Sequence, residues 1–117
     1  MGTRTDAYLV YGVKLKEGSF SSIGGGDAEP GTPKHLAWSG KPHNGIAIET
    51  HCSSEFREYI VCAAEPKYMA SRGNPVRIHP LNLVETPPAG FRLLDYCKEH
   101  GLETDGVPGW LLFSYWG

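Results

Sequence analysis

The chain has 117 residues, a formal net charge of −2 and a hydrophobic share of 40%. These totals fit one globular domain with a genuine core and exclude a chain that is disordered throughout. A net acidic chain has no general basic field for nucleic acid. The sequence shows no secretory h-region and no apolar run of membrane-spanning length, so we expect neither a secretory leader nor a membrane span.

The first predicted element is a strand over residues 8–15. This segment is rich in β-forming residues and apolar on both faces, as expected of a central strand or of one beneath a lid. Gly12 interrupts the apolar run. It predicts a bulge or a close approach of another backbone.

Residues 16–44 are rich in Gly, Ser and Pro and predict a long loop, a feature that is usually functional or disordered. Its triple glycine at 24–26 is followed by Asp27 and not by the Lys-Ser/Thr of a phosphate-binding loop, so nucleotide binding is not indicated. A short strand is expected at 35–38. Trp38 either folds the loop back onto the sheet or forms an exposed anchor for a partner.

Two further strands are predicted at 46–52 and 59–64, joined by a loop at 53–58. Alternation places Ile46 and Ile48 on the core face of the first strand. We expect Pro66 to end the second strand because proline has no N–H to donate to a ladder. Residues 75–79, bounded by prolines, are a candidate for a short edge strand.

One convincing helix follows, with Thr86 as a candidate N-cap and Gly101 as its left-handed ending. Phe91, Leu94 and Cys97 recur at helical spacing and predict its buried stripe, which Leu93 widens. A last strand is expected at 110–116, with its aromatic side chains buried.

Together these elements predict an α+β fold in a single domain of residues 1–117. The sheet has four or five antiparallel or mixed strands, with one main helix packed on one face. Three cysteines, an odd number, favour a reducing cytoplasm, and Cys52, Cys62 and Cys97 each lie in an apolar pattern typical of a buried free thiol.

Charge is unevenly distributed along the second half of the chain. Residues 66–80 carry three basic residues and no acid, whereas residues 81–117 carry an excess of acids. Either these are two solvated faces, or the surface is polarised and orients a partner. Nucleic acid could in principle use the basic segment with Tyr68, but the small patch and the acidic total disfavour it.

Reactive residue types gather around residue 51. A small hydrolase or transferase could use His51 with Glu49 or Glu55, or a Cys52 thiolate. His51 and Cys52 are adjacent in a predicted strand and so point to opposite faces, which prevents them from acting as a pair. No histidines and cysteines have the local spacing of a zinc site, and we predict no metal and no cofactor.

Three segments carry a resemblance: YLVYGVKL near the start, HCSSEFREYIVCAA in the centre and GWLLFSYWG at the end. With them the chain resembles small uncharacterised accessory proteins of tailed bacteriophages. The resemblance implies expression in a bacterial cytoplasm, and action by binding and blocking a host enzyme or defence complex. It transfers no functional residue.

We therefore expect a non-enzymatic binding protein, a phage-encoded inhibitor of a host defence complex of the anti-CRISPR kind, which acts by surface contact. Besides the enzyme described above, the alternative is a self-associating virion component whose aromatic strand edges pair between copies. A homodimer is one state considered for the chain. The predicted contact residues lie in the long loop, the 53–58 loop and the basic segment: Trp38, Glu55, Arg57, Glu58, Lys67, Tyr68, Arg72, Arg77 and His79.

Overall fold

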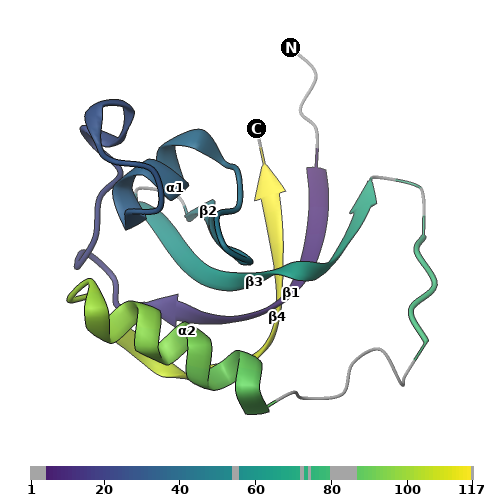
Figure 1. The fold of residues 1–117 in the computed structure, drawn as a ribbon. Coiled ribbons are helices and arrows are strands. Elements are labelled where there is room, and N and C mark those ends of the chain that lie inside the picture. The colour runs from purple at the N-terminus through teal and green to yellow at the C-terminus, as the bar shows by residue number, and fades with distance from the viewer. Residues whose placement is uncertain (1–4, 54–55, 72, 74, 80–86, 117) are drawn as a thin grey trace.

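The computed structural model describes residues 5–53, 56–71, 73, 75–79 and 87–116, with the backbone alone described at 5, 51–53, 56–57, 66, 87–88 and 115–116. A four-stranded antiparallel sheet carries two helices on one side (Figure 1). This confirms the predicted α+β fold. The elements in chain order are β1 (Thr5–Leu15), the 3-10 turn η1 (Gly25–Asp27), α1 (Pro33–Ser39), β2 (Ile46–Ser53), β3 (Phe56–Ser71), α2 (Pro87–Glu99) and β4 (Thr104–Trp116).

The strand order in the sheet is β2-β3-β1-β4, so β1 is a central strand, as its two apolar faces predicted. β2 and β3 form a hairpin, and β1 pairs with β3 on one side and with β4 on the other. None of the helices in the described part of the chain is both long and apolar enough to cross a bilayer.

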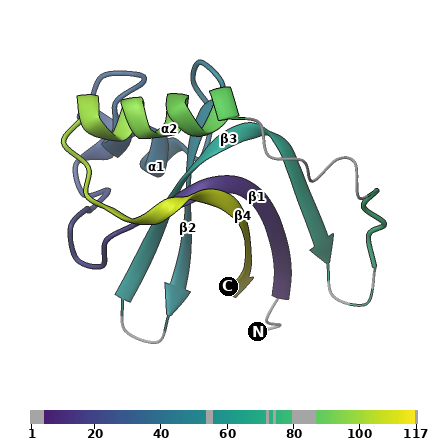
Figure 2. The ribbon, with the colours of Figure 1, turned by 90° about the horizontal axis from the view of Figure 1, so that it is seen from below.

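The sheet is strongly coiled at the middle of β3. Val10 pairs with Lys67, whereas Gly12 pairs with Cys62, so the register shifts and several residues of β3 bulge between these two pairs. Figure 2 shows the resulting arch, with the helices above it. Coiling brings the two edge strands, β2 and β4, within 8 Å of one another at their Cα atoms.

The prediction that Pro66 ends the strand at 59–64 is wrong. β3 continues through Pro66 to Ser71, and Pro66 falls between the two registers with β1. A bulge leaves backbone groups out of the ladder, so the missing N–H of proline removes no pairing bond there.

Both faces of the sheet bury apolar side chains. Between the sheet and the helices lie Tyr11, Val13, Leu15, Leu36, Ile46, Ile48, Tyr59, Val61, Leu93 and Cys97. On the inner side of the arch lie Val10, Ala47, Ile60 and Cys62, with Leu111 and Phe113 of β4 packed against them. The coiled sheet therefore encloses a second, smaller core of its own.

The buried stripe of α2 differs from the predicted one. Leu93 and Cys97 are buried at 1% and 2% exposure, but Phe91 is 67% exposed and Leu94 lies at the surface. The helix is thus turned about its axis relative to the predicted orientation, and Gly90 explains why. A Cβ at Gly90 would lie 3.1 Å from the Tyr11 hydroxyl, so the helix approaches the sheet on the side of this glycine. Gly101 has φ +66° and ends the helix, as predicted.

Two predicted short strands are wrong. Residues 35–38 belong to α1, which begins after Thr32 with Pro33 in its first turn and ends at Gly40 with φ +68°. These are strong helix start and stop signals, and they outweigh the β-preference of Trp38. Residues 75–79 lie outside every strand, because flanking prolines limit the bonds that such a segment can offer to a sheet.

Candidate partner-binding surface

The loop between β1 and β2 displays a tryptophan on a firmly held helix. Leu36 of α1 is 1% exposed and inserts into the core between sheet and helices. Trp38, two residues later, lies on the opposite side of the helix because each residue advances it by about 100°. Trp38 is 61% exposed. Leu36 thus ties the loop to the sheet, and Trp38 is left at the surface.

The triple glycine supports Trp38 from behind. A Cβ at Gly25 would overlap the carbonyl oxygen of Lys34 and would lie 2.5 Å from Cβ of Trp38. A Cβ at Gly26 would lie 3.3 Å from Cε2 of the same indole. Because the turn packs so closely, one side of the ring is held while the other faces solvent. The glycines that do not form a phosphate-binding loop have this packing role instead.

One ring lies beside Trp38, and the same loop exposes a further apolar residue. The His35 ring lies 5.8 Å from the indole, tilted by 44°. Ile23, just before the triple glycine, is 81% exposed. Of these residues only Trp38 was predicted as a contact residue, because an apolar residue in a glycine-rich loop gives no periodic signal.

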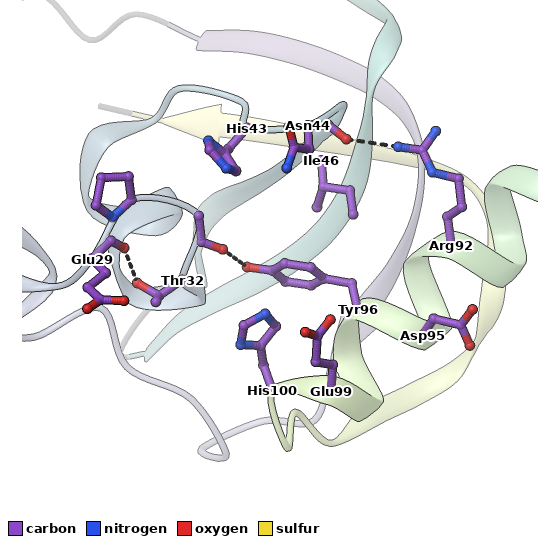
Figure 3. Close-up of a pocket in the computed structure, with 12 residues that line it drawn as sticks. Glu29, Thr32, His43, Asn44, Ile46, Arg92, Asp95, Tyr96, Glu99 and His100 are labelled. Atoms are coloured by element: carbon purple, nitrogen blue, oxygen red, sulfur yellow. Dashed lines mark hydrogen bonds between the residues drawn. The ribbon is translucent and has the colours of Figure 1, made fainter.

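A cleft of about 500 Å³ lies next to the N-terminal end of this helix (Figure 3). Its walls are the loop at 29–32, the turn at 43–46 and one side of α2. The turn is formed by Asn44 with φ +50° and Gly45 with φ +77°, the pair of left-handed residues that a type I′ turn requires. The Asn-Gly dipeptide was therefore the signal in the sequence from which this wall could have been predicted.

Two hydrogen bonds fasten α2 to the cleft walls. The Tyr96 hydroxyl donates to the carbonyl oxygen of Gly31 at 2.8 Å, and Nη2 of Arg92 donates to the carbonyl oxygen of Asn44 at 2.8 Å. Burial, and next the nearby Cys97 and Glu99, raise the pKa of Tyr96 to about 12. At neutral pH the Tyr96 hydroxyl is therefore protonated and donates its hydrogen bond to the loop, which fixes α2 against the loop.

Charged and imidazole groups line the rest of the cleft, but they do not assemble into a metal site. Across the part of the chain that the structure describes, no three His, Cys, Asp or Glu side chains are grouped as a metal ion would need. The cleft side chains that could bind a polar ligand are Glu29, His43, Arg92, Asp95, Glu99 and His100.

Two of the predicted contact residues, Glu58 and Lys67, lie on the inner side of the arch, the face of the sheet opposite to the helices. Nζ of Lys67 donates to Oε1 of Glu49 at 2.6 Å and lies 4.9 Å from the centre of the Tyr8 ring. Glu58 and Lys14 form an ion pair at 3.5 Å. These charges stabilise the rim of the coiled sheet.

The remaining predicted contact residues are dispersed. Tyr68 follows Lys67 in β3 and so lies on the opposite face, where its ring is 6.4 Å from that of Trp110. Arg77 and His79 lie in the segment after β3, with exposed side chains. Glu55 and Arg72 lie outside the described residues, as does the side chain of Arg57. The predicted contact residues that the structure describes therefore do not lie on one common surface.

The groups that the enzyme alternative needs are only partly described. The side chains of His51 and Cys52 and the whole of Glu55 lie outside the described residues. Glu49 accepts the hydrogen bond from Lys67. Burial raises the pKa of Cys62 to about 12 and that of Cys97 to about 11, so neither thiol is a nucleophile near neutral pH.

Comparisons of the chain with protein-family models, with curated proteins and with solved structures find no significant match.

Proposed function

We propose that this protein is a non-enzymatic binding protein whose contact surface is centred on Trp38. The partner is a protein complex of a bacterial host, and the protein acts as a phage-encoded inhibitor of host defence of the anti-CRISPR kind. What supports the choice of partner is the resemblance of three sequence segments to phage accessory proteins. What supports the mode of action is the geometry around Trp38.

The exposed indole of Trp38 is the observation that carries the proposal. A tryptophan side chain buries roughly 150–250 Å² in a core or an interface, so a tryptophan that is 61% exposed leaves on the order of 100 Å² in water. Covering that area would contribute about 2.5 kcal/mol to binding. The close packing of Gly25 and Gly26 holds the ring in place, so little side-chain entropy is lost when a partner covers it.

The proposal is tested by capture of a partner from bacterial lysate on immobilised protein. We expect the wild type to retain one stoichiometric protein or complex, and Trp38→Ala to retain little of it. Phe91→Ala is the matched control, because Phe91 is also an aromatic residue with 67% exposure but belongs to α2. This control should capture as much partner as the wild type.

Thermal unfolding of all three proteins checks that the substitutions leave the fold intact, since neither side chain is buried. Capture of nothing stoichiometric by the wild type would overturn the proposal. So would undiminished capture by Trp38→Ala.

A further inference from the structure

Two tyrosine hydroxyls hold the loop that displays Trp38. Tyr59 of β3 and Tyr96 of α2 both form hydrogen bonds to the loop between β1 and β2. The bond from Tyr59 goes to Ser22, just before the glycine turn at 24–26, and the bond from Tyr96 goes to Gly31, just before α1. The turn and the helix pack against each other at Trp38, and each of them is tied to the body of the protein by one phenol.

The hydroxyl of Tyr59 holds the glycine turn. Tyr59 is 7% exposed and packs in the core between the sheet and the helices. Its oxygen accepts the backbone N–H of Ser22 at 3.4 Å and lies 3.2 Å from Oγ of the same serine. The carbonyl oxygen of Ser22 accepts the N–H of Gly25 at 2.9 Å, and a Cβ at Gly25 would lie 2.5 Å from Cβ of Trp38. Direct contacts thus connect the core to Trp38 through this turn.

The hydroxyl of Tyr96 holds the start of α1. It donates to the carbonyl oxygen of Gly31 at 2.8 Å (Figure 3). Gly31 has φ +89°, and a Cβ on it would lie 2.8 Å from Cδ2 of His43, so a ring packs on this residue as well. The next residue, Thr32, is the N-cap of α1, and its carbonyl oxygen accepts the N–H of Leu36 at 2.9 Å. Tyr96 therefore fixes where the helix that carries the indole begins.

We infer that the hydroxyls of Tyr59 and Tyr96 are positioning groups for the partner-binding surface, because they hold the turn and the helix together around Trp38. This inference rests on the proposed function and adds how the surface is kept ready for a partner. A side chain that is already held in one position loses less conformational entropy when a partner covers it. Phenylalanine would fill nearly the same volume at both positions, so packing alone does not account for the two hydroxyls.

Fluorine NMR of protein labelled with 5-fluorotryptophan tests the inference without a partner. The chain has three tryptophans, and the resonance of Trp38 is the one that is lost in Trp38→Phe. In Tyr59→Phe and in Tyr96→Phe we expect this resonance to broaden or to move toward its position in the urea-unfolded protein. The resonances of the other two tryptophans should stay in place.

Tyr68→Phe is the matched control. It also removes a tyrosine hydroxyl from the protein, but that hydroxyl has no hydrogen-bond partner among the residues that the structure describes, and the ring lies 6.4 Å from Trp110. The resonance of Trp38 should therefore not change in Tyr68→Phe. Thermal unfolding of each variant checks that the fold is intact.

The protein captured from bacterial lysate provides the functional measurement. Its affinity for the double variant Tyr59→Phe, Tyr96→Phe, measured by biolayer interferometry, should be about fivefold lower than for the wild type, the cost of ordering one side chain again on binding. Its affinity for Tyr68→Phe should equal that for the wild type.

An unchanged Trp38 resonance in both single variants would overturn the inference. An equal change at all three tryptophans would also overturn it, because the hydroxyls would then stabilise the whole fold and not this surface. If captured protein is lost in Trp38→Ala but binds the double tyrosine variant at full strength, the binding function stands and the positioning role does not. If the wild type captures nothing, the proposed function fails and the positioning role fails with it.

Discussion

Gly12 of β1 lies directly opposite Cys62 of β3 at the point where the sheet coils most sharply. A Cβ added to Gly12 would lie 2.7 Å from the carbonyl oxygen of Val61 and 2.8 Å from Cβ of Cys62. Both distances are well below van der Waals contact. The strands approach so closely only because residue 12 has no side chain, and the register shift of β3 begins at this pair.

Gly12→Ala should therefore destabilise the protein by about 1–3 kcal/mol, the usual cost of overpacking a core. Urea unfolding monitored by tryptophan fluorescence measures the loss. Gly109→Ala is the matched control, because Gly109 pairs with Gly12 from the β4 side and a Cβ there would meet no atom within 4 Å. Equal losses in the two variants would show that the cost comes from glycine replacement and not from the approach of Cys62.

The stability of the protein should fall at alkaline pH because of Cys62. Burial, and next the charge of Glu49, raise its pKa from 9.0 to about 12, against an opposing effect of Lys67. Between these values the unfolded chain releases the thiol proton and the folded chain keeps it, so rising pH favours unfolding. The contribution of the protonated Cys62 to the free energy of unfolding is fully present below about pH 9. It is lost as the pH rises toward the pKa of Cys62 in the folded protein.

Urea unfolding of wild type and Cys62→Ala between about pH 9.5 and 11 measures the effect. The free energy of unfolding of the wild type should fall more steeply than that of the variant, by about 1.4 kcal/mol per pH unit, the value for one proton. Tyr96 and Cys97 titrate in both proteins and cancel in the comparison. Parallel slopes would mean that the Cys62 thiol is not buried in the folded protein.

Iodoacetamide should modify Cys62 and Cys97 in the native protein only slowly at neutral pH, since both thiols are buried and their pKa values are raised to about 12 and 11. Tryptic cleavage places Cys52, Cys62 and Cys97 in three different peptides, so mass spectrometry reports each thiol separately. In urea all three should react alike. Fast native labelling of Cys62 or Cys97 would contradict the burial described above.

The sequence predicted the fold class and the central position of β1, because alternation and apolar runs depend on local sequence. It could not predict that β3 continues past Pro66, since that outcome depends on the register between β1 and β3 at Gly12. α1 was missed because its seven residues are too few to show a helical period, although Thr32-Pro33 and Gly40 mark its two ends.

The candidate site was less predictable than the fold. Sequence analysis grouped Lys67 with Tyr68 because they are neighbours in the chain, but adjacent residues of a strand face opposite sides of the sheet. The coiling of β3 then places Lys67 beside Glu49 and Tyr8 inside the arch. Trp38 was identified, whereas the glycine turn that holds it could be recognised only from the packing of Gly25 and Gly26.

The contact between Lys67 and Glu49 should stabilise the arch modestly. The atoms are 2.6 Å apart, but the side chains remain 37% and 22% exposed, so solvent screens their attraction. A double-mutant cycle with Lys67→Met and Glu49→Gln should give a coupling energy of about 0.5–1 kcal/mol, and the coupling should shrink in about 1 M salt. The Lys14–Glu58 pair, at 3.5 Å, provides a comparison within the same sheet and should couple more weakly.

The Tyr8 ring offers a way to separate two roles of Lys67, because the ammonium lies 4.9 Å from its centre as well as beside Glu49. Tyr8→Leu removes the cation–π contact, worth about 0.5–1 kcal/mol, and should leave the coupling between Lys67 and Glu49 nearly unchanged. If that coupling disappears in the Tyr8→Leu background, the ring positions the ammonium for Glu49, and the two contacts form one unit that closes the inner side of the coiled sheet.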